Sequence, residues 1–206
     1  MKTNPKKHWE NVYETKSPDD VGWTQKVPET SLKFIHSFNL PKEAKIIDIG
    51  GGDSKLADYL LDEGFKNITV LDISEKALQR ARMRLGKKAK KVKWIVSDIL
   101  EFQPDETYEL WHDRAAFHFL TQEIQIAKYL TIAKKTVSKY MVLATFSKEG
   151  PEKCSGLTVK QYNEELMYSK FKNDFDKIRC LKEDHITPAK SVQKYLFCSF
   201  KKSNQN

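Results

Sequence analysis

A glycine-rich segment limits the fold of this 206-residue chain more than any other feature of its sequence. Residues 45–49 form an apolar run with a single aspartate, Asp48, and Gly50, Gly51 and Gly52 follow directly, before a helical pattern. A strand, a glycine turn and a helix form the first βα unit of a nucleotide-binding α/β domain, because glycines let the backbone approach a ligand and adopt unusual dihedral angles. The segment therefore predicts a ligand site at the end of this strand.

The residues around the glycines limit which nucleotide the turn can bind. A dinucleotide-binding turn has a third glycine where this chain has Lys55, and no phosphate-binding Gly-Lys-Ser/Thr loop follows. The pattern present is Asp-x-Gly-x-Gly, with Asp48 on the strand and Ser54 where a small residue is expected. Asp53 or Ser54 is expected to cap the following helix, over residues 54–63.

Two further predicted strands end in acidic residues. Residues 67–74 indicate a second strand that carries Asp72, and residues 92–99 indicate a third that carries Asp98. A carboxylate at the tip of the second strand can accept hydrogen bonds from both ribose hydroxyls of an adenosine.

Together these segments resemble the class I S-adenosylmethionine-dependent methyltransferases, over roughly residues 30–146. The resemblance implies an α/β fold with a doubly wound, mostly parallel, seven-stranded sheet and helices on both faces, the Rossmann-like methyltransferase fold. It implies S-adenosylmethionine as the cofactor, methyl transfer as the activity and no metal. The cofactor-binding residues that it implies are Asp48, Gly50, Gly51, Gly52, Ser54, Asp72, Ile73, Asp98, Ile99 and Trp23.

The length predicts a single domain over residues 1–206, with a Rossmann-like core at 41–206. Residues 1–40 carry helical patterns near 5–15 and 30–38, and the resemblance implies that such a segment folds over the cofactor as a lid. Trp23 is then a candidate cover for the cofactor or the substrate, although burial against the sheet edge explains it equally well.

Charge and cysteine content set expectations for partners and location. Much of the net charge of +8 falls in residues 87–93, between the second helix and the third strand, at the sheet end opposite the ligand. We therefore favour a solvated charge run over a nucleic-acid contact. Three widely spaced cysteines predict neither a disulfide framework nor a zinc site. No apolar run reaches the ~20 residues that span a bilayer, so we expect a cytoplasmic protein without a membrane partner.

The segment 111–120, at the tip of a fourth predicted strand (108–112), carries the candidate reaction chemistry, because the resemblance implies that the transferred methyl group points there. His112 and Asp113 are candidates for orienting or deprotonating the acceptor, and Arg114 and His118 for binding it. The alternatives are that Asp113 and Arg114 pair with each other and cap the next segment, and that His118 is a packed ring.

The residues after the fourth strand also narrow the acceptor. The segment 113–116 lacks the prolines and the stacking aromatic that methyltransferases of exocyclic base amines use. It also contains no cysteine, which the methyltransferases of cytosine C5 use as their nucleophile. It loosely resembles the Asp-basic-small triplet of seven-stranded protein-lysine methyltransferases. We therefore expect a protein lysine as the acceptor, with a small molecule as the runner-up. A non-catalytic adenosine-binding regulatory module, and a nicotinamide-dependent oxidoreductase that Lys55 disfavours, are the other hypotheses.

Overall fold

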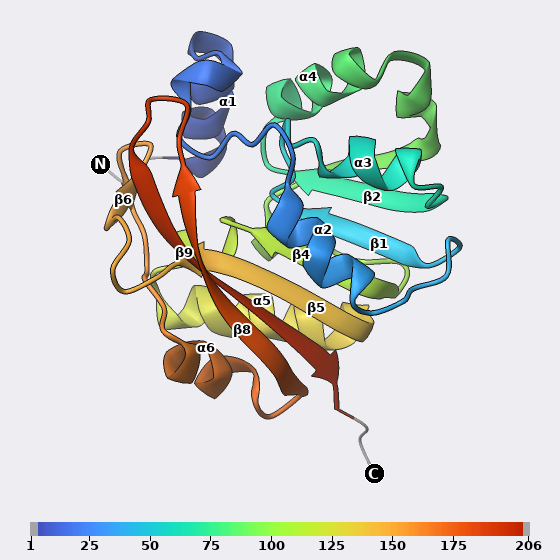
Figure 1. The fold of residues 1–206 in the computed structure, drawn as a ribbon, viewed down its shortest axis with the longest axis vertical. Coiled ribbons are helices and arrows are strands. Elements are labelled where there is room, and N and C mark those ends of the chain that lie inside the picture. Colours follow the sequence, from blue (N-terminus) through green and yellow to red (C-terminus); the bar gives the residue numbers. More distant parts are fainter. Residues whose placement is uncertain (1–3, 204–206) are drawn as a thin grey trace.

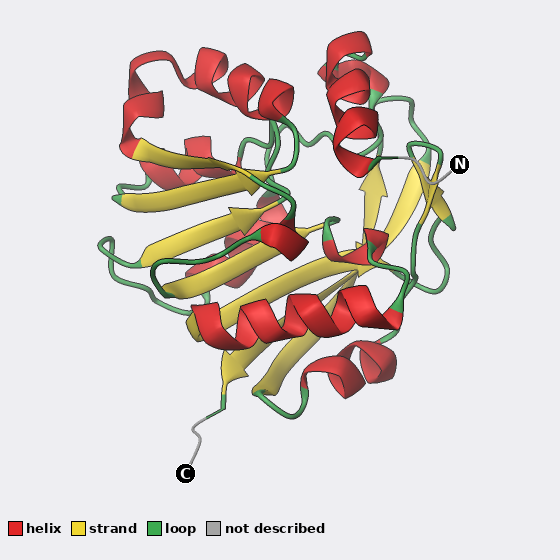
Figure 2. Cartoon of the chain, turned by 180° about the vertical axis from the view of Figure 1, so that it is seen from behind, coloured by secondary structure: helices red, strands yellow, loops and turns green. Residues whose placement is uncertain are grey.

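The computed structural model describes residues 4–203, which form a seven-stranded sheet with helices on both faces (Figures 1 and 2). The strand order is β3-β2-β1-β4-β5-β9-β8, and a separate two-stranded ribbon pairs β6 with β7. The strands are β1 (Lys45–Ile49), β2 (Asn67–Asp72), β3 (Val92–Val96), β4 (Tyr108–Arg114), β5 (Val137–Phe146), β6 (Lys153–Cys154), β7 (Leu157–Thr158), β8 (Phe175–Ile186) and β9 (Val192–Lys202).

The helices divide between the two faces of the sheet. Helices α2, α3 and α4 cover one face, and α5 and α6 cover the other, while α1 stands beside α4 at the end of the sheet (Figures 1 and 2). The helices are α1 (Pro5–Thr15), α2 (Glu29–His36), α3 (Leu56–Asp62), α4 (Glu75–Leu85), α5 (Glu123–Thr136) and α6 (Glu164–Phe171), with short 3₁₀ turns η1 (Pro18–Asp20), η2 (Gly86–Lys91), η3 (Ile99–Glu101) and η4 (Phe117–Phe119).

The strand order reverses at the centre of the sheet. Strand β1 pairs in parallel with β2 on one side and with β4 on the other, and the chain builds outward to β3 before it returns to β4. An α/β sheet binds its ligand beyond the carboxyl ends of the strands at such a reversal. The antiparallel pair β8–β9 completes the sheet beside β5. The expected seven-stranded α/β fold is therefore confirmed.

Strand β4 is longer than the sequence pattern predicts, and this changes its chemistry. The strand runs to Arg114, so Asp113 and Arg114 lie on it, after His112, rather than in the loop that follows. Successive side chains of a strand point to opposite faces. His112 and Asp113 therefore belong to different layers of the molecule.

The helix after the glycine turn begins two residues later than predicted. Helix α3 starts at Leu56 with Lys55 as its N-cap residue, and Asp53 does not cap it. The Ser54 hydroxyl accepts the Leu56 N–H at 3.2 Å. Ser54 thus stabilises the start of α3, although it stands outside the cap position.

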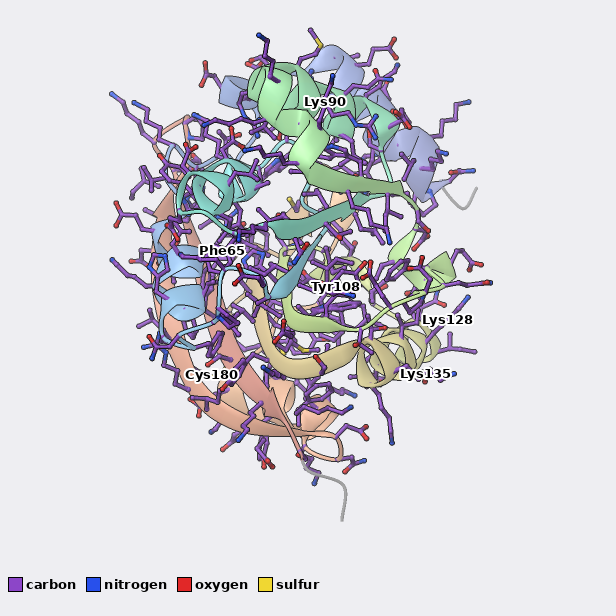
Figure 3. The ribbon with its side chains drawn as sticks, turned by 90° about the vertical axis from the view of Figure 1, so that its right-hand side faces the viewer. Phe65, Lys90, Tyr108, Lys128, Lys135 and Cys180 are labelled. Carbon is purple, nitrogen blue, oxygen red and sulfur yellow. A yellow bond between two sulfur atoms is a disulfide. The ribbon has the colours of Figure 1, made fainter. Side chains whose placement is uncertain are left out.

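Helix α5 does not bury the face that the 3.6-residue apolar period of segment 121–138 predicts, which has Ile124, Ala127, Leu130 and Val137 facing inward. Ile124 is 76% exposed, and the buried side chains include Ile126, Tyr129 and Ala133. Lys128 and Lys135 lie on the outer side of this helix (Figure 3). Tyr129 therefore carries its hydroxyl group into the core, where it donates to Asp113.

The basic segment between α4 and β3 forms η2, on which Lys90 lies (Figure 3).

The prediction that the cysteines form no disulfide is wrong in this structure. Cys180 on the edge strand β8 is bonded to Cys198 on β9, while Cys154 is a buried free thiol (Figure 3). The antiparallel register places Cys180 directly opposite Cys198, a proximity that their separation in the sequence does not reveal. Within residues 4–203 there is no helix with the length and hydropathy to cross a bilayer.

Candidate functional site

A cavity of about 450 Å³ lies at the carboxyl ends of the central strands, beneath α1 and the segment that follows it. It brings together residues that are far apart in the sequence. The predicted site residues that line it are Trp23, Asp48, Gly50, Gly51, Ser54, Asp72, Ile73, Asp98, Ile99, His112 and Arg114. Gly52, Asp113 and His118 are not among its lining residues.

The glycine turn forms one wall of the cavity, where side chains would not fit. Gly50 has a φ of +62°, and a Cβ atom on it would lie 2.6 Å from the Cβ of Ala116. A Cβ on Gly51 would lie 2.6 Å from a carboxylate oxygen of Asp48. A Cβ on Gly52 would lie 2.6 Å from the hydroxyl of Tyr13 on α1. The turn therefore keeps its backbone open to the cavity at Gly50 and Gly51, while α1 covers Gly52.

Asp72 places a carboxylate at the tip of β2. One of its oxygens accepts the Ser74 N–H at 2.8 Å. Burial is the largest influence on this carboxyl and raises its pKa to about 7, against the lowering effect of the Ser74 and Gly52 N–H groups. Such a carboxylate gains from hydroxyl donors, because hydrogen bonds to the charged form offset its desolvation.

The tip of β3 supplies a second carboxylate with apolar neighbours. Asp98 caps η3 by accepting the Leu100 N–H at 2.8 Å. Ile73 and Ile99 line the cavity near the ends of β2 and β3. An apolar slot with acids at its ends suits an adenosine, whose base is flat and whose ribose carries hydroxyls.

His112 is held by a buried hydrogen-bond chain. Its Nδ1 lies 2.7 Å from the Asp48 carboxylate and its Nε2 lies 2.9 Å from the Ser31 hydroxyl on α2. With a neutral ring, Nδ1–H donates to Asp48 and Nε2 accepts from Ser31. Both ring nitrogens of His112 are therefore engaged in this structure, and its predicted catalytic role stays a prediction. It positions Asp48 beside the glycine turn.

Asp113 points away from the cavity, which corrects its predicted catalytic role. One oxygen accepts the N–H groups of Ala116 and Phe117 at 2.9 and 3.1 Å, and the other accepts the Tyr129 hydroxyl at 2.8 Å. Its side chain is fully buried in the α5 layer, and burial raises its pKa to about 6. The alternative that Asp113 caps the next segment is confirmed, but it does not pair with Arg114.

Arg114, one residue on, lies on the cavity side of β4. Its Nη1 donates to the Trp23 carbonyl oxygen at 3.0 Å, and its guanidinium lies 4.7 Å from the centre of the Tyr195 ring. His118 is completely buried, and its Nδ1 accepts the Phe146 N–H at 3.2 Å. Burial lowers the pKa of His118 to about 3. His118 is thus a packed neutral ring and not the predicted substrate ligand.

Aromatic rings cover the cavity above Arg114. The ring centre of Trp9 on α1 lies 5.7 Å from that of Trp23 and 5.1 Å from that of Phe119 on η4. Trp23 therefore packs against Trp9 at the cavity, and its role as a cover for the cofactor or the substrate stays a prediction. All three rings line the cavity and make this end of it apolar.

The contacts that hold α1 over the cavity could not be found from the sequence. Glu10 accepts the Glu75 N–H at 2.8 Å and the Ser74 hydroxyl at 3.0 Å, so it caps α4 from outside. Arg80 on α4 donates to the carbonyl oxygen of Lys16 at 2.6 Å. These pairs join segments more than sixty residues apart, and each residue taken alone looks like an ordinary surface charge.

Comparisons with known proteins support this geometry. Residues 46–139 match the family model described as a methyltransferase domain. The mouse eEF1A lysine and N-terminal methyltransferase is 26% identical over 121 residues, which cover 58% of this chain and 17% of that protein. Malonyl-[acyl-carrier protein] O-methyltransferase 1 of Ilyobacter polytropus is 26% identical over 118 residues, covering 56% of this chain and 42% of that protein. The chain thus spans a minor part of the curated relatives it matches.

Solved structures share the fold over nearly the whole chain. A SAM-dependent methyltransferase from Anabaena variabilis superposes with a TM-score of 0.76 at 15% identity, covering 98% of this chain and 96% of that one. The N-methyltransferase NodS of Bradyrhizobium japonicum, in complex with S-adenosylhomocysteine, gives a TM-score of 0.72 at 15% identity, covering 95% and 98%. With its glycine turn, its acid-tipped strands and this strand order, the chain is similar to a methyltransferase domain over residues 46–139 and has the fold of the class I S-adenosylmethionine-dependent methyltransferases.

Proposed function

We propose that this chain transfers the methyl group of S-adenosylmethionine to an acceptor held at the aromatic end of the cavity. The observation that carries the proposal is that one cavity has two chemically different sets of lining residues. We take the glycine turn, Asp72 and Asp98 as the cofactor end, and Trp9 and Phe119 as the acceptor end. A methyltransferase needs both ends in contact, because its two reactants meet directly.

The residues of the first end fit an adenosine cofactor, and we assign their roles as part of this proposal. Asp72 accepts hydrogen bonds from the ribose hydroxyls, and Asp98 from the adenine amino group. Ile73 and Ile99 flank the base, and the open backbone at Gly50 approaches the rest of the molecule. When bound, the cofactor supplies a methyl group on a positively charged sulfur.

The remaining cofactor assignments also belong to the proposal. His112 orients the Asp48 carboxylate, and Ser54 and Gly51 complete the wall of the turn. Helix α1 and the segment up to α2 act as a lid, with Trp23 as a cover. Since His112 and Asp113 are fully engaged, the chain promotes transfer by orientation and by exclusion of water rather than by a general base.

We propose a small molecule as the acceptor, with a protein lysine as the second candidate. The covered, aromatic end of the cavity suits a compact group, and the permanent charge of Arg114 disfavours an approaching ammonium. The lysine acceptor draws support from the likeness to the eEF1A lysine and N-terminal methyltransferases. The likeness to the malonyl-[acyl-carrier protein] O-methyltransferase supports a small acyl group as the acceptor.

Two measurements test the proposed function. Calorimetry should show binding of S-adenosylhomocysteine and none of NAD. Radiolabelled methyl transfer from S-adenosylmethionine into a fractionated cell extract should label a small-molecule fraction, and Gly50→Val should abolish it. Label in a protein band would support the lysine acceptor instead. Cofactor binding without any transfer would support a regulatory module, and failure to bind S-adenosylhomocysteine would refute the assignment.

A further inference from the structure

Arg114 is partly buried, and two of its three guanidinium nitrogens are shielded from solvent without a negative charge to neutralise them. Its Nη1 has one partner, the Trp23 carbonyl oxygen, while its Nε and Nη2 are buried and have no hydrogen-bond partner among residues 4–203. No ion pair of Arg114 forms within that same range. Buried guanidinium groups are normally paired, because desolvating a charge without a partner costs free energy.

The two unused nitrogens form one edge of the guanidinium. In arginine, the N–H bonds of Nε and one Nη point the same way and match the spacing of two oxygens of a carboxylate or phosphate. The third nitrogen, on the opposite edge, is the one that the Trp23 carbonyl occupies. The side chain is therefore anchored with its bidentate edge free of protein acceptors.

The neighbouring side chains add no negative charge at neutral pH. Burial lowers the pKa of His118 to about 3, and burial also lowers the pKa of His185. Burial raises the pKa of the Cys154 thiol to about 11 and that of the Tyr195 hydroxyl to about 12. The Nε2 of His118 also lacks a partner, and because its Nδ1 accepts an N–H, this nitrogen carries the proton. The region has donors in excess of acceptors.

Among the described residues, the acid that influences His185 and Tyr195 is Glu183. One of its oxygens accepts the Gln25 amide at 3.4 Å, and the other is buried without a partner. It acts on the pKa values of His185 and Tyr195, as Arg114 does, but it does not pair with Arg114. An experiment therefore has to exclude Glu183 as the ion-pair partner of Arg114 within the protein.

We propose that Arg114 binds an anionic group, a carboxylate or a phosphate, on the methyl acceptor. The inference rests on the proposed function, because the cavity that Arg114 lines is where the acceptor lies. The aromatic cover of Trp9 and Phe119 contacts the apolar body of the same molecule. The segment that carries Trp23 lies against the guanidinium, so the anion reaches Nε and Nη2 when this segment shifts. The bound anion is held for recognition, and the methyl group goes to another atom of the acceptor.

The test measures anion binding by thermal unfolding of the full chain saturated with S-adenosylhomocysteine. Acetate, benzoate, inorganic phosphate and phenyl phosphate are the anionic probes, and benzamide and butylamine are the neutral and cationic controls. We expect benzoate or phenyl phosphate to raise the melting temperature, and benzamide to leave it unchanged. The benzoate and phenyl phosphate arms distinguish a carboxylate from a phosphate. Arg114→Met should weaken anion binding about tenfold or more, the scale for losing a charged hydrogen bond.

Three further variants keep the result interpretable. Arg114→Lys keeps the charge but loses the paired donors, so it should weaken binding by less. Arg179→Met is the matched control, since that guanidinium also lies on an aromatic ring, 4.2 Å from the centre of Phe34, but is exposed. Glu183→Gln should leave anion binding intact or strengthen it.

The inference is overturned if no anion stabilises the protein, if Arg114→Met binds the anion as wild type does, or if only butylamine stabilises it. It is also overturned if Arg114→Met and Glu183→Gln each destabilise the free protein while the double variant costs no more than one of them, since the two side chains would then be each other's partner. Calorimetry with S-adenosylhomocysteine separates these failures from failure of the proposed function. Binding of that molecule without any anion effect refutes only the role of Arg114.

Discussion

Asp113 and Arg114 are adjacent on β4, and both are charged groups withdrawn from water, yet their surroundings differ completely. Asp113 accepts three hydrogen bonds from the turn after β4 and from Tyr129. Arg114 makes one, to the Trp23 carbonyl, and keeps two nitrogens unpaired. Because successive side chains of a strand face opposite layers, Asp113 enters the core and Arg114 enters the ligand cavity. A buried charge with every partner present is part of the structure, whereas one without partners is available to a ligand.

The largest effect that this comparison predicts is on stability. Asp113→Ala leaves two backbone N–H groups and the Tyr129 hydroxyl without their acceptor, so it should lower the free energy of unfolding by about 3 kcal/mol. Urea unfolding at pH 7 measures this loss. Asp98→Ala is the matched control: it also removes an aspartate that caps a 3₁₀ turn, but one that is only half-buried, and it should cost about 1 kcal/mol or less. Equal losses in the two variants would contradict the structural role of Asp113.

Asp72 is intermediate between Asp113 and Arg114, because its carboxylate is buried but accepts fewer hydrogen bonds than that of Asp113. If its carboxylate accepts the ribose hydroxyls, Asp72→Ala should weaken binding of S-adenosylhomocysteine by about 10- to 100-fold, measured by calorimetry. Asp62→Ala removes an exposed aspartate of α3 that pairs with Lys88 away from the cavity and should leave the affinity unchanged. Unaltered affinity in a folded Asp72→Ala protein would remove Asp72 from the site.

The parts of the site that the sequence predicts correctly are carried by short contiguous stretches. The glycine turn and the tips of β2 and β3 each combine an apolar run with a nearby acid, so the family resemblance, the fold class that it implies and the places of Asp72 and Asp98 at the cavity follow from these local patterns. A parallel sheet brings such tips to one edge by itself. No knowledge of distant contacts is needed.

What the sequence mispredicts depends on strand length and on distant partners. Ending β4 at His112 instead of Arg114 places Asp113 in a loop that faces the ligand, and two more strand residues turn it toward α5. Its partner Tyr129 is 16 positions away, and the Ser31 partner of His112 is 81 positions away. No local pattern encodes either pairing, so both residues look free in the sequence.

A titration separates the two buried carboxyls further. Asp72 and Asp113 have pKa values raised by burial to about 7 and about 6, so each contributes stability that is present at acid pH and is lost as pH rises through these values. Ligand hydroxyls favour the ionised form of Asp72 alone. Affinity for S-adenosylhomocysteine should therefore increase between pH 6 and pH 8, by up to about tenfold.

Asp72→Asn is the variant that assigns this pH dependence. It should flatten the affinity profile measured by calorimetry, while the stability profile keeps the part that Asp113 contributes. A pH dependence that survives in Asp72→Asn would assign the titration to another group in the cavity.

The smallest effect concerns His112. Like Asp113, it has hydrogen-bond partners within the protein, and like Arg114, it lines the cavity. Ser31→Ala removes the hydroxyl that donates to Nε2 and should cost about 1 kcal/mol of stability. If His112 only positions Asp48, the variant should leave the shape of the pH profile of methyl transfer unchanged, since the Nδ1–H bond to Asp48 is retained. If His112 is instead a base held in reserve, freeing Nε2 should shift that profile and raise the rate near neutral pH. Ser37→Ala, which removes a hydroxyl bonded only to the Phe34 carbonyl in the same helix region, is the matched control. A shifted profile in Ser31→Ala alone would return His112 to the group of residues that act on the acceptor.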